Sequence, residues 1–216
     1  MARYLDREEA GRELANALGP VGGNVVVLGL PRGGVPVAAE IARALGAPLD
    51  VLVVRKLGVP GREELAMGAV ASGGVRVLNH ALIQALGISP VTVDAVTTLE
   101  RRIVERRERH LRQAMEPLRL EGRTVILVDD GVATGASARA ALQVVRAAGA
   151  SKVIFAAPVA PPDVVGSLDA EADRVVIPYQ PEPFRAVGAW YDGFDPVPEG
   201  AVRRLLDAAR AAPVEA

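Results

Sequence analysis

The sequence contains no cysteine, two histidines, two lysines and few aromatic residues, and each shortage excludes a class of chemistry. Without cysteine there can be no disulfide framework, thiolate nucleophile or cysteine-ligated zinc. His80 and His110 leave little material for a histidine metal site or an acid–base triad. Aromatic residues make up 3% of the chain against 50% hydrophobic residues, so the core must consist mainly of Val, Leu, Ile and Ala. Such a core is typical of a buried parallel sheet.

The sequence also lacks a large excess of basic or acidic residues, and it lacks long apolar runs. The 25 basic and 26 acidic residues give a formal net charge of −1, which argues against a globally basic nucleic-acid-binding protein. No run approaches the roughly 20 apolar residues of a membrane span, and the first residues lack the apolar segment of a signal peptide. We therefore expect a cytoplasmic protein without a membrane partner. The length of 216 residues predicts a single domain over residues 1–216.

Short apolar runs alternate with helical patterns along the chain. The runs predict buried strands at 25–28, 49–54, 125–128, 153–157 and 175–177. Helices are predicted at 6–18, 35–45, 137–148, 162–170 and 199–211, with a hairpin over 67–78 and a long helix from Ser89-Pro90 toward Pro117. This order is typical of an α/β fold with a single twisted, mostly parallel sheet flanked by helices.

Three segments rich in Gly or charge follow directly after predicted strands. They are Gly-Leu-Pro-Arg-Gly-Gly at 29–34, Arg-Lys-Leu-Gly at 55–58, and the segment 129–137 that begins Asp-Asp-Gly. The carboxyl ends of parallel strands share one edge of the sheet, where ligands bind, so the three segments should converge there. Cations beside backbone amides suit phosphates, and paired carboxylates suit sugar hydroxyls or Mg²⁺.

The third segment has the properties of a phosphate-binding loop. Residues 133–137, Ala-Thr-Gly-Ala-Ser, turn from a strand into a helix, so that backbone N–H groups and two hydroxyls point out of the helix N-terminus. The spacing matches neither a Walker loop nor a dinucleotide-binding fingerprint. A helix start capped by Asp or Thr, with solvated aspartates, is the alternative interpretation.

The segment Val125–Ser137 resembles the signature of type I phosphoribosyltransferases: four apolar residues, two acidic, three variable, then Thr-Gly-x-Ser. Leu30–Gly34 is similar to the pyrophosphate loop of that family, and Arg55-Lys56 is similar to the basic pair of its orotate-type members. The resemblance covers about residues 24–178. The wider pattern from Arg55 to Ala69 resembles a subgroup known mainly as predicted phosphoribosyltransferases.

The resemblance implies the type I phosphoribosyltransferase fold and a Mg²⁺-dependent enzyme. Such an enzyme would transfer the 5-phosphoribosyl group of phosphoribosyl pyrophosphate (PRPP) to an unidentified base and release pyrophosphate. A non-catalytic regulator that binds PRPP is the alternative. Partners would be PRPP and a small-molecule acceptor, and a homodimer is compatible with the sequence.

The family's roles transfer to matching positions of this chain. Asp129 and Asp130 would bind the ribose hydroxyls and, through these hydroxyls or water, Mg²⁺. The 5-phosphate would bind at Ala133, Thr134, Gly135, Ala136 and Ser137, and pyrophosphate at Arg32, Gly33, Arg55 and Lys56. Catalysis would rest on Asp129, Asp130, Lys56 and Arg32.

Three features of the sequence differ from the family pattern or allow more than one interpretation. A helical insert at 79–122 stands where the family has a flexible catalytic loop, so it is either a lid or packs elsewhere. The tail 178–211 corresponds to the family's hood, in which Phe184 and Trp190 either stack on the base or form a small core. Ala133 replaces an aspartate that meets the purine in hypoxanthine/guanine-type members, which argues against 6-oxopurine salvage.

Overall fold

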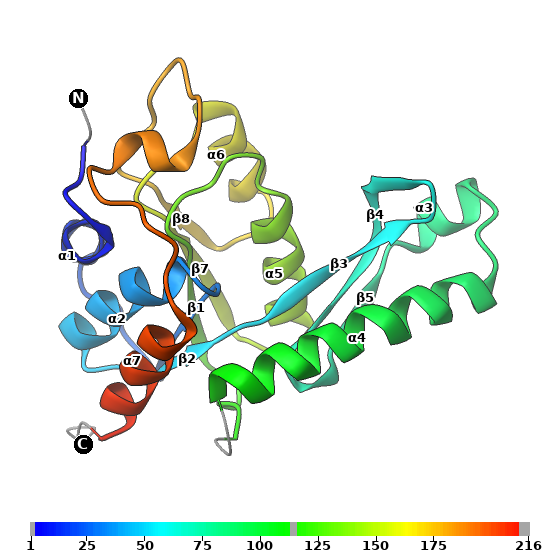
Figure 1. Cartoon of the computed structure of the whole chain (residues 1–216), viewed down its shortest axis with the longest axis horizontal. Coiled ribbons are helices and arrows are strands. Elements are labelled where there is room, and N and C mark those ends of the chain that lie inside the picture. Colours follow the sequence, from blue (N-terminus) through cyan, green and yellow to red (C-terminus); the bar gives the residue numbers. More distant parts are fainter. Residues whose placement is uncertain (1–2, 113–115, 212–216) are drawn as a thin grey trace.

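A computed structural model describes residues 3–112 and 116–211 (Figure 1). Five parallel strands form the central sheet in the order β2-β1-β6-β7-β8. Their bounds are β1 Val25–Gly29, β2 Leu49–Val51, β6 Thr124–Val128, β7 Lys152–Ala156 and β8 Arg174–Val176. The parallel α/β sheet predicted from the sequence is confirmed.

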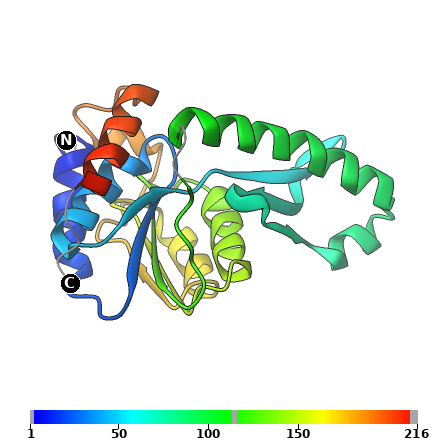
Figure 2. The same cartoon turned by 90° about the horizontal axis from the view of Figure 1, so that it is seen from below.

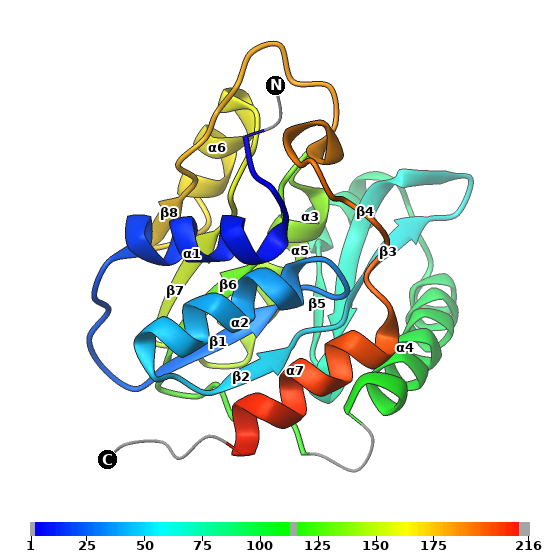
Figure 3. The same cartoon turned by 60° about the vertical axis from the view of Figure 1, so that its left-hand side comes forward.

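Helices cover both faces of this sheet (Figure 3). One face packs with α1 (Arg7–Leu18), α2 (Gly34–Leu45) and α7 (Glu199–Ala211), and the other with α5 (Ala136–Ala147) and α6 (Pro162–Asp169). Val25 and Val27 of β1 point to the first face, and Val26 and Leu28 to the second. Both faces are buried, which explains why the strands read as continuous apolar runs rather than as alternating ones.

A second sheet, antiparallel and three-stranded, leaves the body of the protein (Figures 1 and 2). It consists of β3 (Val54–Val59), β4 (Arg62–Ala71) and β5 (Arg76–Leu78), with the short turn η1 (Ser72–Gly74) before β5. Together with α3 (His80–Ala85) and α4 (Pro90–Arg112) it forms what we call the arm, residues 54–112.

The second sheet corrects the expectation of a single sheet. The strand predicted at 49–54 ends at Val51, and the chain then turns into β3. Ser72 holds the chain at this turn, because its backbone N–H donates to the Val53 carbonyl at 3.0 Å and its hydroxyl accepts from the Val53 N–H at 3.1 Å. The predicted hairpin is real, but β4 begins at Arg62 and pairs with β3 as well as β5.

The insert 79–122 contains α3 and α4. Ser89 caps α4 as predicted, since its hydroxyl accepts from the Thr92 N–H at 3.1 Å. The predicted continuation of the helix to Pro117 is wrong at Glu116 and Pro117, which are not helical, while residues 113–115 lie outside the described part. Helix α4 packs against β3, β4 and α7, which favours packing elsewhere over a lid. None of the described helices combines the length and apolar character that a membrane span requires.

A buried ion pair fastens the end of α4 to the edge strand β2. Arg112 Nε lies 2.9 Å from Asp50 Oδ1, and the two side chains are 5% and 1% exposed. The other carboxylate oxygen of Asp50 accepts from the Leu118 N–H at 3.0 Å, and Arg112 also donates to the Val51 carbonyl. Asp50 therefore connects the arm, the connection to β6 and the central sheet.

The predicted hood-like tail 178–211 divides into two parts with different positions. Residues 178–195, here called the hood, include the short helix η2 (Val187–Trp190) and reach Asp130 beside β6. Helix α7 instead packs against α2, α4 and β2, with Val202 and Leu206 buried there. Only the first part of the tail is therefore placed to act at the predicted site.

We expect Asp50→Asn to lower the free energy of unfolding by about 1–3 kcal/mol, because it removes the more deeply buried of the two carboxylates that pair with Arg112, while Glu108 remains. Asp94→Asn is the matched control: Asp94 pairs with Arg76 at 3.0 Å, but its side chain is 71% exposed. The control should cost under about 1 kcal/mol. Urea unfolding of both variants measures the difference, and equal losses would contradict the anchoring role of Asp50.

Candidate functional site

Two of the predicted loops touch where β1 and β6 end. The register pairs Gly29 with Val128, so the chain leaves both strands side by side. The Leu30 N–H then donates to the Val128 carbonyl at 2.8 Å. A Cβ added to Gly34 would lie 2.6 Å from that same carbonyl oxygen, so only glycine permits this contact.

Gly33 brings the first loop against the acidic pair. A Cβ at this position would lie 1.8 Å from Asp130 Oδ2. The Asp130 carboxylate can therefore occupy this space only because Gly33 has no side chain. Within the same loop the Pro31-Arg32 peptide bond is cis, and the Arg32 side chain is exposed. The structure thus joins the 29–34 and 129–137 loops at one sheet edge, as the topology predicts.

Asp129 and Asp130 are half-buried neighbours at the end of β6. The Asp130 N–H donates to Asp129 Oδ1 at 2.9 Å. Burial raises the pKa of Asp129 well above its usual value, and repulsion by the Asp130 carboxylate raises it further. A bound cation, or hydroxyl groups that donate hydrogen bonds, would relieve this repulsion.

Arg7, at the start of α1, pairs with Asp130. The distance from Arg7 Nε to Asp130 Oδ2 is 2.8 Å. From the hood, the Tyr191 hydroxyl donates to the Asp130 carbonyl at 2.5 Å. Neither contact follows from the sequence pattern, because they join residues 123 and 61 positions apart and neither Arg7 nor Tyr191 belongs to a local motif.

The start of α5 is open. Gly135 precedes the helix in the left-handed conformation, with φ of 71°, and no side chain caps the helix N-terminus. Ala133, Thr134 and Ser137 are exposed around it. The capped helix start, which was the alternative interpretation of this segment, is not observed. Backbone N–H groups at an open helix start favour an anion, and the helix dipole adds to this preference.

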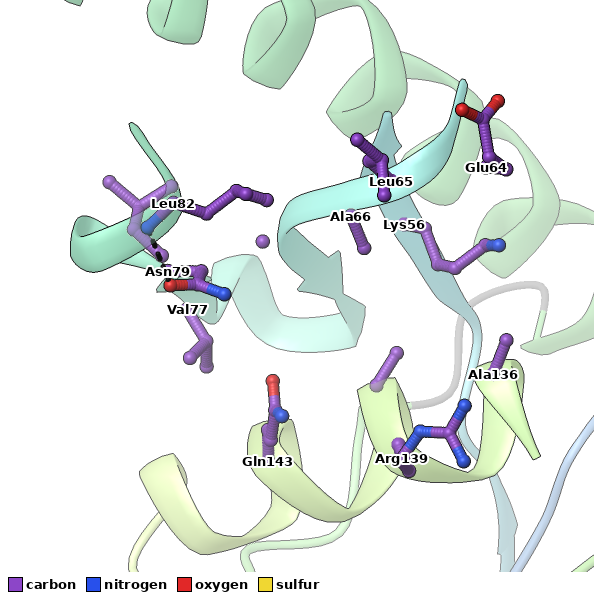
Figure 4. A pocket seen from close by; sticks show the side chains of 13 residues that line it. Lys56, Glu64, Leu65, Ala66, Val77, Asn79, Leu82, Ala136, Arg139 and Gln143 are labelled. Atoms are coloured by element: carbon purple, nitrogen blue, oxygen red, sulfur yellow. Dashed lines mark hydrogen bonds between the residues drawn. The ribbon is translucent and has the colours of Figure 1, made fainter. Parts of the chain in front are cut away.

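Two cavities adjoin the 133–137 loop. One, of about 510 Å³, lies between the arm and α5 (Figure 4); Lys56, Asn79, Ala136, Arg139 and Gln143 are among its lining residues. The other, of about 770 Å³, is an open groove toward the hood, lined by Ala133, Thr134, Pro161, Asp163, Glu182, Pro183, Phe184 and Arg185. The loop therefore faces both the arm and the hood.

The predicted basic pair is divided between two faces of β3. Lys56 lines the cavity beside Ala136, at the start of α5. Arg55 pairs with Glu100 of α4, with Nε and Oε2 2.7 Å apart. Adjacent residues on a strand point to opposite faces, so only one of the two can face α5. The structure brings Lys56, and not Arg55, toward the phosphate-loop candidate.

The two aromatic candidates of the hood have different surroundings. Phe184 lines the groove together with Thr134. Trp190 packs edge-on against Tyr179, with ring centroids 5.3 Å apart, and lies 6.3 Å from Phe184. Trp190 is thus part of a small aromatic cluster, and Phe184 is the better placed of the two for contact with a ligand in the groove.

Asp129 and Asp130 are the residues at this edge of the sheet that could contribute carboxylates to a metal ion. Within residues 3–112 and 116–211 there is no group of three or more His, Cys, Asp or Glu residues that could hold a metal. Mg²⁺ commonly takes one or two carboxylates and completes its shell with water and substrate phosphate oxygens. Asp129 and Asp130 supply that number of carboxylates.

Comparison with known proteins identifies relatives of the chain. Residues 6–186 match the family model described as "Phosphoribosyl transferase domain". Two Mycobacterium tuberculosis proteins, from strains CDC 1551 and H37Rv, are each 48% identical over 210 residues, and their names assign them provisionally as phosphoribosyl transferases. The match covers 97% of this chain and 47% of each relative, so the chain spans about half the length of these curated relatives.

A solved structure also resembles the chain throughout. The crystal structure of the protein TT1426 from Thermus thermophilus is 45% identical in sequence and superposes with a TM-score of 0.88. The match covers 94% of this chain and 97% of that one. The central sheet and the arm therefore belong to an arrangement that is shared with a relative.

We expect Gly33→Ala to lower the free energy of unfolding by about 1–3 kcal/mol, because the new methyl group overlaps the Asp130 carboxylate. Gly22→Ala is the control, since its Cβ would meet nothing within 4 Å. Urea unfolding compares the two variants. A Gly33→Ala protein as stable as the Gly22→Ala protein would contradict the close contact between the loops.

Proposed function

Because the chain belongs to the family that shares the phosphoribosyl transferase domain, we propose that it transfers the 5-phosphoribosyl group of PRPP to a small-molecule acceptor and releases pyrophosphate. One observation carries the proposal: the open N-terminus of α5 lies directly after the acidic pair at the carboxyl edge of the sheet. An anion bound at the helix start would then lie near hydroxyl groups or a cation bound at the acidic pair, which supports binding of a phosphorylated sugar.

The 5-phosphate would bind in the loop formed by residues 133–137. The backbone N–H groups at the start of α5 would donate to the phosphate oxygens, and the exposed hydroxyls of Thr134 and Ser137 would add two donors. Arg139 braces this loop from within α5, because its Nη2 donates to the Thr134 carbonyl at 3.2 Å.

Asp129 and Asp130 would accept hydrogen bonds from the ribose hydroxyls. Mg²⁺, held through these hydroxyls or water, would neutralise charge on the pyrophosphate group when bound. With ribose bound in this way, the half-buried carboxylates would lie near the positive charge that develops on its ring, and such fixed charges stabilise a transition state without reorganisation.

Pyrophosphate would lie between the first loop and the arm. Exposed Arg32, with Gly33 beside it, would bind from the loop, and Lys56 from the arm; Arg55 is committed to Glu100. In the reaction, the bond from C1 of the ribose to the pyrophosphate oxygen breaks, and the electron pair leaves with pyrophosphate. An acceptor nitrogen forms the new bond to C1, and a proton that it carried passes to pyrophosphate or solvent. The chain contributes positioning and charge stabilisation.

The groove toward the hood is the candidate acceptor site. Phe184 offers a ring face for stacking, and Arg185, Glu182 and Asp163 offer charged groups at its rim. Ala133 stands at the position where hypoxanthine/guanine-type members place a carboxylate. This disfavours 6-oxopurines, so an acceptor screen should include adenine, pyrimidines and nicotinate-like acids beside them.

We expect Thr134→Val to weaken PRPP binding by about 1.5–3 kcal/mol, because it removes a hydroxyl donor to a charged phosphate while it preserves side-chain shape. Thr98→Val, an exposed threonine on α4, is the control. Isothermal titration calorimetry with PRPP and Mg²⁺ measures both affinities. An unchanged affinity of the Thr134→Val protein would rule out the phosphate assignment.

A second experiment separates the enzyme from a regulator that binds PRPP without turnover. Pyrophosphate release is measured with PRPP, Mg²⁺ and the acceptor panel. If Lys56 stabilises departing pyrophosphate, Lys56→Ala should lower kcat by roughly 100-fold, as expected for loss of one preorganised electrostatic group. Lys152→Ala, which removes the only other lysine at an exposed position, should leave kcat unchanged.

Saturable PRPP binding by the unmodified protein, without release of pyrophosphate for any acceptor, would instead favour the regulator.

A further inference from the structure

Arg7 is the only residue of α1 with a hydrogen bond to the acidic pair in the described part of the chain, and its guanidinium also contacts the hood. Nε binds Asp130 Oδ2 at 2.8 Å, and Nη1 donates to the Asp195 carbonyl at 3.0 Å. The guanidinium carbon lies 3.9 Å from the ring centroid of Phe194. Asp130 belongs to the proposed ribose site, whereas Phe194 and Asp195 belong to the hood.

The position of Arg7 is itself fixed by the hood. The Asp192 N–H donates to the Tyr4 carbonyl at 2.9 Å, and the Gly193 N–H donates to the Leu5 carbonyl at 2.8 Å. Tyr4 is 1% exposed, and its hydroxyl donates to the Pro158 carbonyl at 3.0 Å. The segment before α1 is therefore joined to the hood along its backbone, two residues before Arg7.

The ion pair leaves part of Asp130 available. Arg7 and Asp130 side chains are 12% and 16% exposed, so the pair is shielded from solvent but not sealed. Oδ2 accepts from Arg7. The guanidinium donates to the Asp130 carboxylate through one nitrogen and to the hood through another, so a single side chain contacts both.

We propose that Arg7 is a positioning residue of the ribose site, which holds the Asp130 carboxylate in orientation and couples it mechanically to the hood. The proposal rests on the function proposed above, because it assigns Asp130 to the ribose hydroxyls. Ribose binding at Asp130 and the placement of the hood over the acceptor groove are then linked through one side chain. The hood reaches Asp130 independently through Tyr191, so Arg7 completes a second connection between them.

The test compares Arg7→Met, Arg7→Lys and the control Arg12→Met, which removes an exposed cation from the same helix. Isothermal titration calorimetry gives the affinity for PRPP with Mg²⁺. Acrylamide quenching of Trp190, the only tryptophan of the chain, reports exposure of the hood without any ligand.

For Arg7→Met we expect an affinity loss of about 10- to 100-fold, the range typical of residues that orient a ligating group, together with stronger quenching. Arg7→Lys keeps a cation near Asp130 but loses the simultaneous contacts to Asp195 and Phe194. It should recover most of the PRPP affinity and still show the stronger quenching. Arg12→Met should match the unmodified protein in both measurements.

The outcomes distinguish this inference from the proposed function. If the unmodified protein does not bind PRPP, the proposed function fails and the inference fails with it. If the unmodified protein binds PRPP and Arg7→Met behaves like Arg12→Met, only the inference is overturned. Equal affinity losses in Arg7→Met and Arg7→Lys would also overturn it, because a merely structural role predicts no rescue by lysine.

A further variant covers the case in which Arg7→Met does not fold. Phe194→Leu retains the ion pair and removes the ring beneath the guanidinium. We expect stronger quenching of Trp190 and a severalfold loss of PRPP affinity. Quenching and affinity equal to those of the unmodified protein would overturn the coupling.

Discussion

The in-register pairing of β1 with β6 is the constraint on which the candidate site depends. It brings Gly29 beside Val128, so the two following loops leave the sheet at the same place. The loops can then approach closely only because Gly33 and Gly34 lack side chains. The acidic pair, the exposed Arg32 and the open start of α5 are all placed by this one contact between neighbouring strands.

A second constraint positions the arm. Asp50 and Arg112 form a buried pair that ties the end of α4 to the edge strand β2, while Ser72 holds the chain at the turn from β2 into β3. Helix α4 then supports one face of β3 through Arg55 and Glu100, and the opposite face turns Lys56 toward α5. The distribution of the two basic residues is therefore a consequence of how the arm is attached to the body.

The third element is the meeting of two segments that lie far apart in sequence. The residues before α1 and the hood pair along their backbones, and the rings of Tyr4 and Tyr191 pack with centroids 5.5 Å apart. Arg7 extends from this junction to Asp130. The candidate site, which consists mainly of loops that follow parallel strands, therefore also includes a contact from α1, the helix that precedes β1.

The sequence by itself determined the parallel sheet, its helices and the edge at which the phosphate-binding candidates gather. These features follow from local patterns: apolar runs, caps such as Ser89, and a thirteen-residue signature that spans β6 and the loop after it. Tertiary structure alone decided that Lys56 faces α5 while Arg55 faces Glu100. It further decided that a second sheet begins at Val54, and that α7 packs against α2, α4 and β2 instead of forming part of the hood. It also decided the contact of Arg7 with Asp130. The physical reason is that each of these outcomes depends on contacts between distant segments, which no local pattern of residues specifies.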